Sequence, residues 1–533
     1  MLNGRLVRTF ILSGAAVAAL AAHARAGDLD DLKSQIEALQ SRVTELEDQG
    51  TAPPQPLKPV SIFTGQGALA DWNVDRKQEG AMPSDRGYTF LISPSADVPA
   101  PITQVSVSGY VKGDFIFDFD QESLGPTFTS GIGIDYRLQK DQGFQTTAQQ
   151  TRFRIRSSTN TAIGDIRTLI EGDFYNAGRG FRLRHAWGEW DMTPNWTLGI
   201  GRYWRLGYDV FTGVPLVDFG GSVGSPGASR REQVRLQYQD GPLLFAFGIQ
   251  NPSNSQGGYR QVALCTLTVT GFSTCFAGET LGTAYSVPNT PNLPAFGGHM
   301  MYHAEFGHQF FIGGEISQHN VDRTAAKDIP EDGFGDEPGP FKDPGLWNNK
   351  NKVGWVVSAG ANINLDDYAT LTGNVSFSEG LVTRIVGAGS DIWRFESEPT
   401  DDDIRNSLQA GRGWGGYVGL SFDINNETSF NTQFGFVDPS DRNMTGGNIT
   451  WSHMYTAHAN IIWQPLRQMR MGWEIMYAQK TNGKNFVDGY AQPELGGCNE
   501  ELEDGAIIVK PTSICRKRKE YALRAQFAAW LFF

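Results

Sequence analysis

Residues 103–120 alternate between two kinds of side chain, and this period of two constrains the fold more than any other feature. Apolar or small side chains occupy the odd positions of 105–119, whereas polar or charged ones occupy the even positions of 106–120 apart from Ile116. A strand this long exceeds the usual length in soluble proteins. The pattern favours a membrane barrel, in which one face of each strand contacts lipid and the other contacts water.

The alternation returns along the chain in a rhythm of long strand, short turn, long strand and long loop. Short turns are expected at residues 162–164, 193–195, 240–241, 307–308, 365–367, 425–426 and 465–468. Long polar loops are expected at residues 121–149, 205–229, 251–294, 320–351, 378–414, 438–448 and 481–518, with a briefer one at 176–180. Short turns at one end and long loops at the other are typical of bacterial outer-membrane barrels. Threading the chain this way predicts an all-β, antiparallel transmembrane barrel of about sixteen strands, enough to leave an aqueous channel.

The last predicted strand is amphipathic in the same way. Its odd positions from Tyr521 to Phe533 are apolar or small, whereas Glu520, Arg524 and Gln526 share the other face. An amphipathic last strand that ends in Phe resembles the signal by which outer-membrane barrels are recognised for insertion. We therefore assign residues 102–533 to the barrel.

Residues 1–26 have the composition of a secretory signal peptide. Arg5 and Arg8 precede a short apolar run, and the small residues Ala24 and Ala26 follow it. The alternative is a membrane anchor, but the apolar run is shorter than the ~20 residues of a spanning helix.

Residues 27–49 are expected to form a short coiled-coil helix. Apolar residues recur there with spacings of three and four, as in an a/d seam: Leu29, Leu32, Ile36, Leu39, Val43 and Leu46. The alternative is a lone amphipathic helix. The residue types at a and d favour a dimer, although a barrel trimer would override so short a seam. Residues 50–101 begin with a Pro-rich spacer, show no clear periodicity after it, and are assigned as a linker and connecting segment.

Composition excludes several classes of function. A formal net charge of -13 argues against nucleic-acid binding. We find no Gly-rich phosphate loop, no Ser/His/Asp arrangement and no His/Cys cluster with metal-ligand spacing, so we predict no enzyme activity, no cofactor and no metal. The cysteines allow three pairings. We expect the local disulfides Cys265–Cys275 and Cys498–Cys515, which suit an exported chain, rather than free thiols.

Arginines occupy the polar face of several predicted strands. Arg152, Arg154 and Arg156 alternate with Phe153 and Ile155. An arginine facing lipid near the bilayer midplane costs ~2–4 kcal/mol, so these side chains are expected to line the water-filled interior. The predicted pore-lining and anion-binding set is Arg152, Arg154, Arg156, Arg167, Arg182, Arg184, Arg235 and Arg524. Rings of arginine favour anions, and bidentate pairing makes dicarboxylates a reasonable solute.

A general or carbohydrate-preferring channel is the alternative. Such channels set a basic wall against an acidic wall, and Glu171, Asp173, Asp209 and Asp218 are candidates for the acidic one. Residues 205–229 are expected to be a Gly-rich loop that folds into the barrel and constricts it, with Asp209 and Asp218 at the constriction. An ordinary surface loop is the other possibility for this segment.

Aromatic residues near the predicted strand ends are expected to form interfacial belts. The set is Trp187, Trp190, Trp196, Trp204, Trp355, Trp463, Trp473 and Trp530; sugar-stacking in a carbohydrate channel is an alternative role.

Strict alternation also predicts that His185 and Glu189 face outward with Leu183 and Trp187. A subunit interface would hide these polar groups from lipid and so favours an oligomer.

Four segments resemble the DcaP-like outer-membrane porin family. They are residues 109–112 (GYVK), 151–153 (TRF), 173–175 (DFY) and 181–190 (FRLRHAWGEW). The resemblance is clearest over residues 109–238, and the block at 181–190 is its most specific part. The cysteine-bearing loops depart from the family pattern.

The resemblance implies a trimeric, sixteen-stranded barrel in the bacterial outer membrane with a periplasmic coiled-coil extension. Its expected partners are further copies of the chain, membrane lipid and lipopolysaccharide, and small anionic solutes such as dicarboxylates. Arg152, Arg182 and Arg184 lie at motif positions, whereas Arg154 and Arg156 rest on periodicity alone. A barrel enzyme or an adhesin is a third, weaker hypothesis.

Overall fold

The computed structural model describes most of the predicted barrel. The described residues are 60–66, 69, 85–92, 103–119, 125–128, 142–176, 178–209, 212–252, 266–267, 273–274, 291–320, 351–388, 391–394, 408–439, 451–482 and 519–533. All of them except Val60 belong to one compact unit made of residues 61–92 and 101–533. The predicted signal peptide, the predicted coiled-coil helix and all four cysteines lie outside the described residues.

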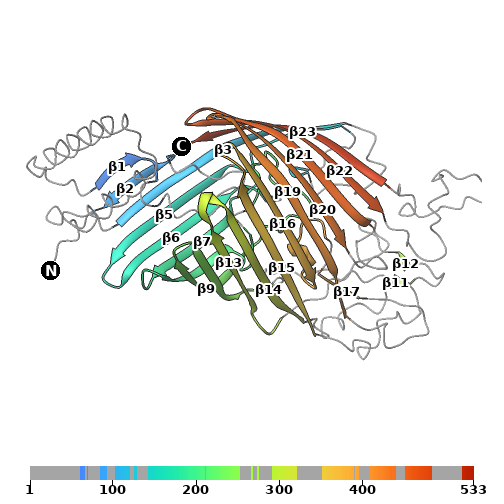
Figure 1. The fold of residues 1–533 in the computed structure, drawn as a ribbon, viewed down its shortest axis with the longest axis horizontal. Coiled ribbons are helices and arrows are strands. Elements are labelled where there is room, and N and C mark those ends of the chain that lie inside the picture. Colours follow the sequence, from blue (N-terminus) through green and yellow to red (C-terminus); the bar gives the residue numbers. More distant parts are fainter. Residues whose placement is uncertain are drawn as a thin grey trace, which may run out of the picture. The chain divides into compact units, whose positions relative to one another are not determined.

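The strands form one antiparallel sheet that closes on itself, with each barrel strand paired to the next along the chain (Figure 1). The barrel strands are β3 (Thr103–Asp118), β5 (Arg152–Thr161), β6 (Gly164–Asp173), β7 (Arg182–Asp191), β8 (Trp196–Trp204), β9 (Arg230–Asp240), β10 (Leu243–Gln250), β13 (Ala295–His303), β14 (Gln309–Asn320), β15 (Asn351–Asn364), β16 (Ala369–Glu379), β19 (Arg412–Asn425), β20 (Thr428–Pro439), β21 (Trp451–Leu466), β22 (Met469–Asn482) and β23 (Lys519–Phe532). The ring closes where β23 pairs with β3, from Arg524 opposite Asp118 to Phe532 opposite Tyr110. The predicted sixteen-stranded barrel is therefore confirmed.

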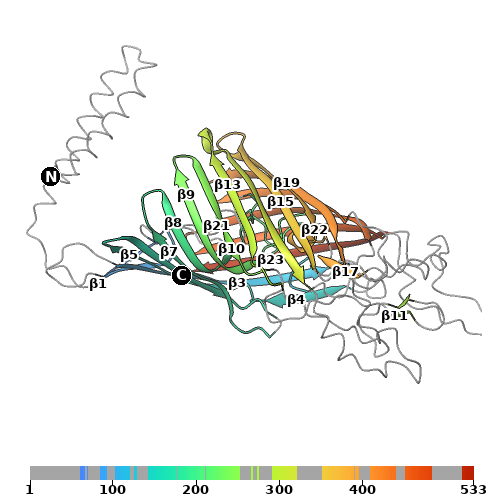
Figure 2. The same ribbon diagram turned by 90° about the horizontal axis from the view of Figure 1, so that it is seen from below.

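Three further strands extend the sheet on both sides of β3 (Figure 2). The strand β2 (Tyr88–Ile92) pairs with residues 103–107 of β3 and with β1 (Val60–Thr64), and β4 (Gly143–Thr147) pairs with residues 114–118. Residues 61–101, for which the sequence predicts no secondary structure, thus contain β2 and most of β1, and the expectation that 121–149 is a loop is wrong at β4. The physical reason is that β3 is longer than the segments that β23 and β5 pair with, so its remaining backbone groups take other partners.

The seven expected short turns each join two neighbouring barrel strands. Because the strands are antiparallel, all seven turns lie at the same end of the barrel. One of them, between β13 and β14, contains the 3-10 turn η3 (Glu305–Gly307). No helix in the described ranges is long and apolar enough to cross a membrane.

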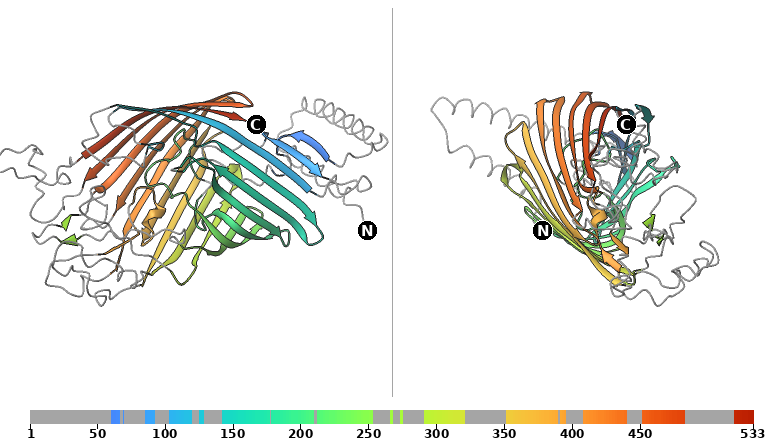
Figure 3. Two further views of the ribbon diagram at one scale, coloured as in Figure 1. Left: turned by 180° about the vertical axis from the view of Figure 1, so that it is seen from behind. Right: turned by 90° about the vertical axis from the view of Figure 1, so that its right-hand side faces the viewer.

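The two faces of the barrel wall have opposite chemistry, as the period-two pattern predicts. On β3, Val111 and Phe115 are exposed on the outside, whereas Lys112 and Asp114 are buried inside. The same holds on β23, where Leu531 is exposed and Arg524 is buried. The strands wrap as a curved wall (Figure 3), and the sheet satisfies its own backbone groups. Such an apolar outer surface is compatible with the hydrocarbon core of a bilayer.

The expected tryptophan belt forms only in part. Trp355, Trp463 and Trp473 are exposed on the outer face, but Trp187, Trp204 and Trp530 are buried. Trp530 falls on the inward-facing even positions of β23, and its indole ring lies 4.6 Å from the Lys112 ammonium. These three side chains therefore pack the interior, so assigning them to an interfacial belt is wrong.

The seam between the last and first strands generates a stability prediction. The Arg524 guanidinium donates two hydrogen bonds to the Asp118 carboxylate, at 2.6 and 3.0 Å, and both side chains are buried. Removing one partner of a buried ion pair leaves the other charge buried and unpaired, which lowers the free energy of unfolding by ~3–5 kcal/mol. We therefore expect Arg524→Met to unfold at a lower urea concentration than the wild type. Tryptophan fluorescence of the vesicle-embedded chain during urea titration measures this midpoint.

A matched control is Arg412→Met, because Arg412 pairs with Glu379 at 3.0 Å while 61% of its side chain is exposed. Exposed pairs contribute less than ~1 kcal/mol. Equal midpoints for the two variants would show that the seam does not depend on the Arg524 ion pair.

Candidate functional site

The loop at residues 205–229, which we call the first inward loop, lies inside the barrel. Its Leu206 N–H donates to Gln250 on β10 at 2.7 Å, and its Pro215 carbonyl accepts from Asn460 on β21 at 2.9 Å. Its Val217 carbonyl accepts from the Lys112 ammonium on β3 at 2.8 Å. A segment that leaves β8 reaches β21 and β3 only by crossing the interior, so it occupies part of the space inside the barrel.

Two glycines permit this close approach. Gly207 and Gly224 both have a φ of +75°, a left-handed conformation that glycine adopts without steric cost. A Cβ atom would lie 2.4 Å from the Gly314 carbonyl oxygen at the first position and 2.0 Å from the Phe436 carbonyl oxygen at the second. No other residue type fits against the wall at these points, which explains the Gly-rich composition of the loop.

Asp209 and Asp218 are both buried and hold the first inward loop in place. The Asp209 carboxylate accepts hydrogen bonds from the Thr212 N–H at 3.0 Å and from the Asn374 amide on β16 at 2.8 Å. Asp218 accepts from the N–H groups of Phe128, Gly220 and Gly221, at 2.8–3.1 Å. Burial raises the pKa of the Asp218 carboxyl, although the nearby Arg524 guanidinium opposes this shift.

The arginines of β5 are turned inward. Arg152, Arg154 and Arg156 are each 1% exposed, whereas Phe153 between them is 38% exposed. They lie beside Glu171 of β6, whose carboxylate is 3.3 Å from the Nε atom of Arg154 and 3.7 Å from that of Arg152. Arg184 of β7 donates to the same carboxylate at 2.7 Å. The fold thus gathers guanidiniums from two strands around one carboxylate.

A β-bulge in β7 changes which side chains of that strand face inward, so the predicted alternation is wrong there. Gly172 pairs with Leu183 and Glu171 pairs with His185, so Arg184 is an extra residue in the ladder. The bulge turns both Arg184 and His185 inward, and from there on the alternation is reversed. His185 and Trp187 are consequently buried, and Glu189 accepts a hydrogen bond from the Trp187 indole at 2.9 Å. The expectation that these side chains face a subunit interface is therefore wrong.

Positive charge exceeds negative charge in this cluster. Its buried members on β5–β7 are four arginines, Arg152, Arg154, Arg156 and Arg184, and two carboxylates, Glu171 and Asp173, which leaves a formal charge of 4 − 2 = +2.

Within the described part of the chain, the Nη2 atom of Arg154 is buried without a hydrogen-bond partner. A buried donor in that state costs ~1–3 kcal/mol, so the cluster favours an additional acceptor, and an anionic one in particular.

The remaining predicted arginines have other partners. Arg167 pairs with Asp191 at 2.6 Å near the short-turn end, and Arg182, 35% exposed, pairs with Asp173 at 2.7 Å. Arg235 donates to the Trp204 carbonyl oxygen at 2.9 Å. Arg167, Arg235 and the seam residue Arg524 lie outside the cluster around Glu171, whereas Arg182 adjoins it through its partner Asp173.

Three strands opposite this cluster carry neutral buried polar side chains, although the Asp209 carboxylate of the first inward loop lies against one of them, Asn374. Among the described residues of β15, β16 and β20, the buried polar side chains are amides and hydroxyls: Ser358, Asn362, Thr372, Asn374, Ser376, Ser378, Asn431 and Gln433. In the ring of strands, β16 lies across from β6. Glu171 and Asp173 therefore belong to the basic wall, and the interpretation that they form an opposing acidic wall is wrong.

Three interior residues were missed at the sequence level. Glu315 of β14 binds Arg384 at 2.9 and 3.1 Å and Arg205 at 3.3 Å. Alternation in β14 places Glu315 inside, because Ile316 beside it is exposed. Nothing in the pattern indicates that Arg384, which lies in a loop, folds back into the barrel to meet it.

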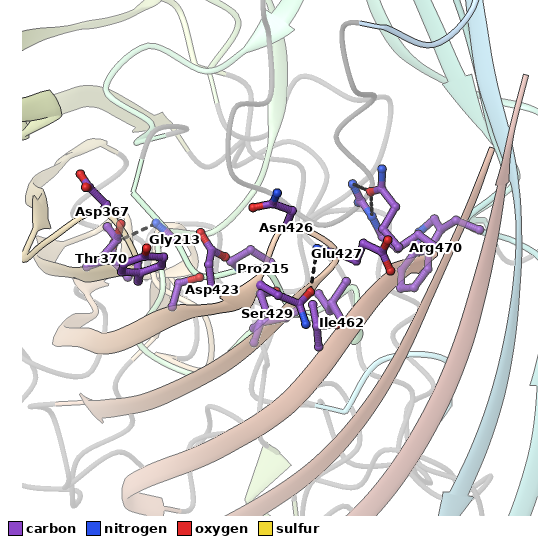
Figure 4. A pocket seen from close by; sticks show the side chains of 18 residues that line it. Gly213, Pro215, Asp367, Thr370, Asp423, Asn426, Glu427, Ser429, Ile462 and Arg470 are labelled. Carbon is purple, nitrogen blue, oxygen red and sulfur yellow. Dashed lines mark hydrogen bonds between the residues drawn. The ribbon is translucent and has the colours of Figure 1, made fainter. Parts of the chain in front are cut away.

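A cavity of about 550 Å³ lies beneath the first inward loop (Figure 4). Gly213, Pro215 and Leu216 of that loop border it on one side. Its other lining residues come largely from the short turns that join β15 to β16, β19 to β20 and β21 to β22, and they include Asp367, Asp423, Glu427 and Arg470. Polar space therefore extends from the first inward loop to the short-turn end of the barrel.

Comparison with known proteins indicates the fold. No family model and no curated protein sequence matches the chain. Among solved structures, the outer membrane channel DcaP of Acinetobacter baumannii matches with a TM-score of 0.55 and 16% identity, over 81% of this chain and 97% of that one. An anion-selective porin from Comamonas acidovorans matches with a TM-score of 0.44 and 10% identity, over 81% of this chain and 100% of that one. The match to DcaP confirms, for the fold, the resemblance seen in the sequence motifs: the chain has the fold of the outer membrane channel DcaP.

Proposed function

We propose that the chain is an outer-membrane porin, a water-filled channel for passive diffusion of small anionic solutes, with dicarboxylates among them. The observation that carries this proposal is the excess of buried positive charge around Glu171, together with the spare N–H donor of Arg154. Guanidinium groups bind carboxylates in a bidentate manner, and rings of them favour anions over cations. The solute would pass between the first inward loop and the barrel wall.

The two ends of the barrel and its outer face suggest how the channel sits in the membrane. We propose that the apolar outer face contacts lipid, that the short turns face the periplasm and that the long loops face lipopolysaccharide. The signal peptide at residues 1–26 and the periplasmic helix at 27–49 are part of this proposal. So are the disulfides Cys265–Cys275 and Cys498–Cys515, which suit an oxidising compartment.

A homotrimer is the oligomer we propose, on the basis of the motif resemblance. The heptad seam at residues 27–49 supports self-association, although its residue types alone favour a dimer. The bulge in β7 removes His185 and Glu189 as support for it. Light scattering of the detergent-solubilised chain, corrected for bound detergent, should give a mass three times the 58.6 kDa of one chain, less any cleaved signal peptide. A mass of one or two chains would refute the trimer.

A channel for neutral or carbohydrate solutes is the second candidate. The amides and hydroxyls on β15, β16 and β20 favour it, because such groups hydrogen-bond to sugars without requiring charge. The two candidates differ in how permeation depends on the basic cluster.

Liposome swelling separates the candidates. Wild-type liposomes should admit a small dicarboxylate faster than a neutral sugar of similar size. In Arg154→Gln the dicarboxylate rate should fall by roughly 10-fold, the equivalent of the ~1.4 kcal/mol lost with one charged hydrogen bond, while the sugar rate stays unchanged.

The exposed variant Arg412→Gln carries the same change of charge and should leave both rates unaltered. If Arg154→Gln left the ratio of the two rates as in the wild type, the neutral-solute channel would be the better account.

A further inference from the structure

A second segment of the chain also folds into the barrel. Residues 380–388 follow β16, contain the 3-10 turn η6 (Val382–Arg384) and are called here the second inward segment. They pair with the first inward loop through their backbones. The Gly224 N–H donates to the Val386 carbonyl at 2.8 Å, and the Val386 N–H donates to the Ser225 carbonyl at 2.9 Å.

Apolar packing joins the two segments. Val382, Ile385 and Ala388 of the second inward segment are buried in a cluster with Val223 of the first inward loop. The same cluster includes Val437, Met454 and Met476 from the inner wall. The two segments thus share a small hydrophobic core inside the barrel, and the position of each depends on the other.

A single carboxylate ties both segments to the wall. Glu315, on β14, accepts hydrogen bonds at 2.9 and 3.1 Å from Arg384 of the second inward segment, and its Oε2 atom lies 3.3 Å from Nη1 of Arg205. Arg205 begins the first inward loop. All three side chains are buried, so the charges are poorly screened. Glu315 forms the direct ion pair with Arg384, and the buried Asp391 carboxylate adds to the compensation of that guanidinium.

We propose that Glu315 is a positioning residue that clamps the two inward segments into one constriction and thereby sets the aperture of the channel. The inference rests on the proposed porin function but not on its anion preference. Breaking the clamp removes the ion pair that holds the second inward segment against β14, so that segment leaves the wall and widens the opening.

The test compares Glu315→Gln with Arg384→Gln in the full-length chain, by single-channel conductance in planar bilayers. The two variants change the local charge in opposite directions, so a purely electrostatic effect would shift the conductance in opposite directions. The clamp predicts that both variants raise it, by roughly 1.5- to 2-fold, because both release the second inward segment from the constriction. The largest polyethylene glycol that enters the pore should increase in size in both.

Three further variants sharpen the comparison. The double variant Glu315→Gln/Arg384→Gln should match the single ones, because residues of one network are non-additive. Arg384→Lys keeps the charge but loses the bidentate contact, and should lie between wild type and Arg384→Gln. Arg412→Gln breaks the exposed pair with Glu379 and should conduct as the wild type does.

Opposite shifts in the two glutamine variants, or wild-type conductance and polymer exclusion in folded Arg384→Lys and Arg384→Gln channels, would overturn the clamp. Zero-current potentials recorded in the same bilayers keep the two proposals apart. A wider pore in the variants with no anion preference in the wild type would support the clamp and refute the proposed selectivity.

Discussion

In a bilayer, backbone donors and acceptors at hydrocarbon depth must find partners within the sheet, and the closure of β23 onto β3 meets that constraint. The period-two alternation follows from it, because a closed wall has one face against lipid and one face inside. The buried charged side chains lie on the inner face, where the Arg524–Asp118 pair supports the seam itself. Both the stability of the barrel and its internal chemistry therefore depend on how the interior charges are paired.

That pairing is uneven, and the imbalance underlies the proposed function. Asp118 is balanced by Arg524, whereas Glu315 faces two arginines, and Glu171 and Asp173 are outnumbered on β5–β7. The wall across from them offers only neutral buried groups on β15, β16 and β20 within the described residues. In the proposed channel, an anion would meet an excess of guanidinium on one side and hydrogen-bonding amides on the other, next to the constriction that we propose the two inward segments form.

The sequence predicts those features that lipid imposes at every strand: the number of strands, the short turns, the inner and outer faces of β3 and β23, and the inward arginines of β5. It does not predict features that depend on pairing between distant segments. The bulge at Arg184 reverses the phase of β7 because the ladder with β6 accommodates an extra residue. Glu315 is recognisable as an inward residue from alternation, but its partner Arg384 lies in a loop whose inward course carries no periodic signal. The strands β1, β2 and β4 form because β3 is longer than the segments that β23 and β5 pair with. No local sequence pattern predicts that difference in length.

The central claim is that the interior favours anions, and the zero-current potential of the wild-type channel tests it most directly. A bilayer separating concentrated from dilute potassium chloride develops a potential whose sign reports the more permeant ion. The account predicts the sign that a chloride-selective channel produces. The magnitude of the potential should fall at higher salt concentration, because salt screens the arginine cluster. A potential with the sign that a potassium-selective channel produces, or no potential at any salt ratio, would contradict the claim that the interior favours anions.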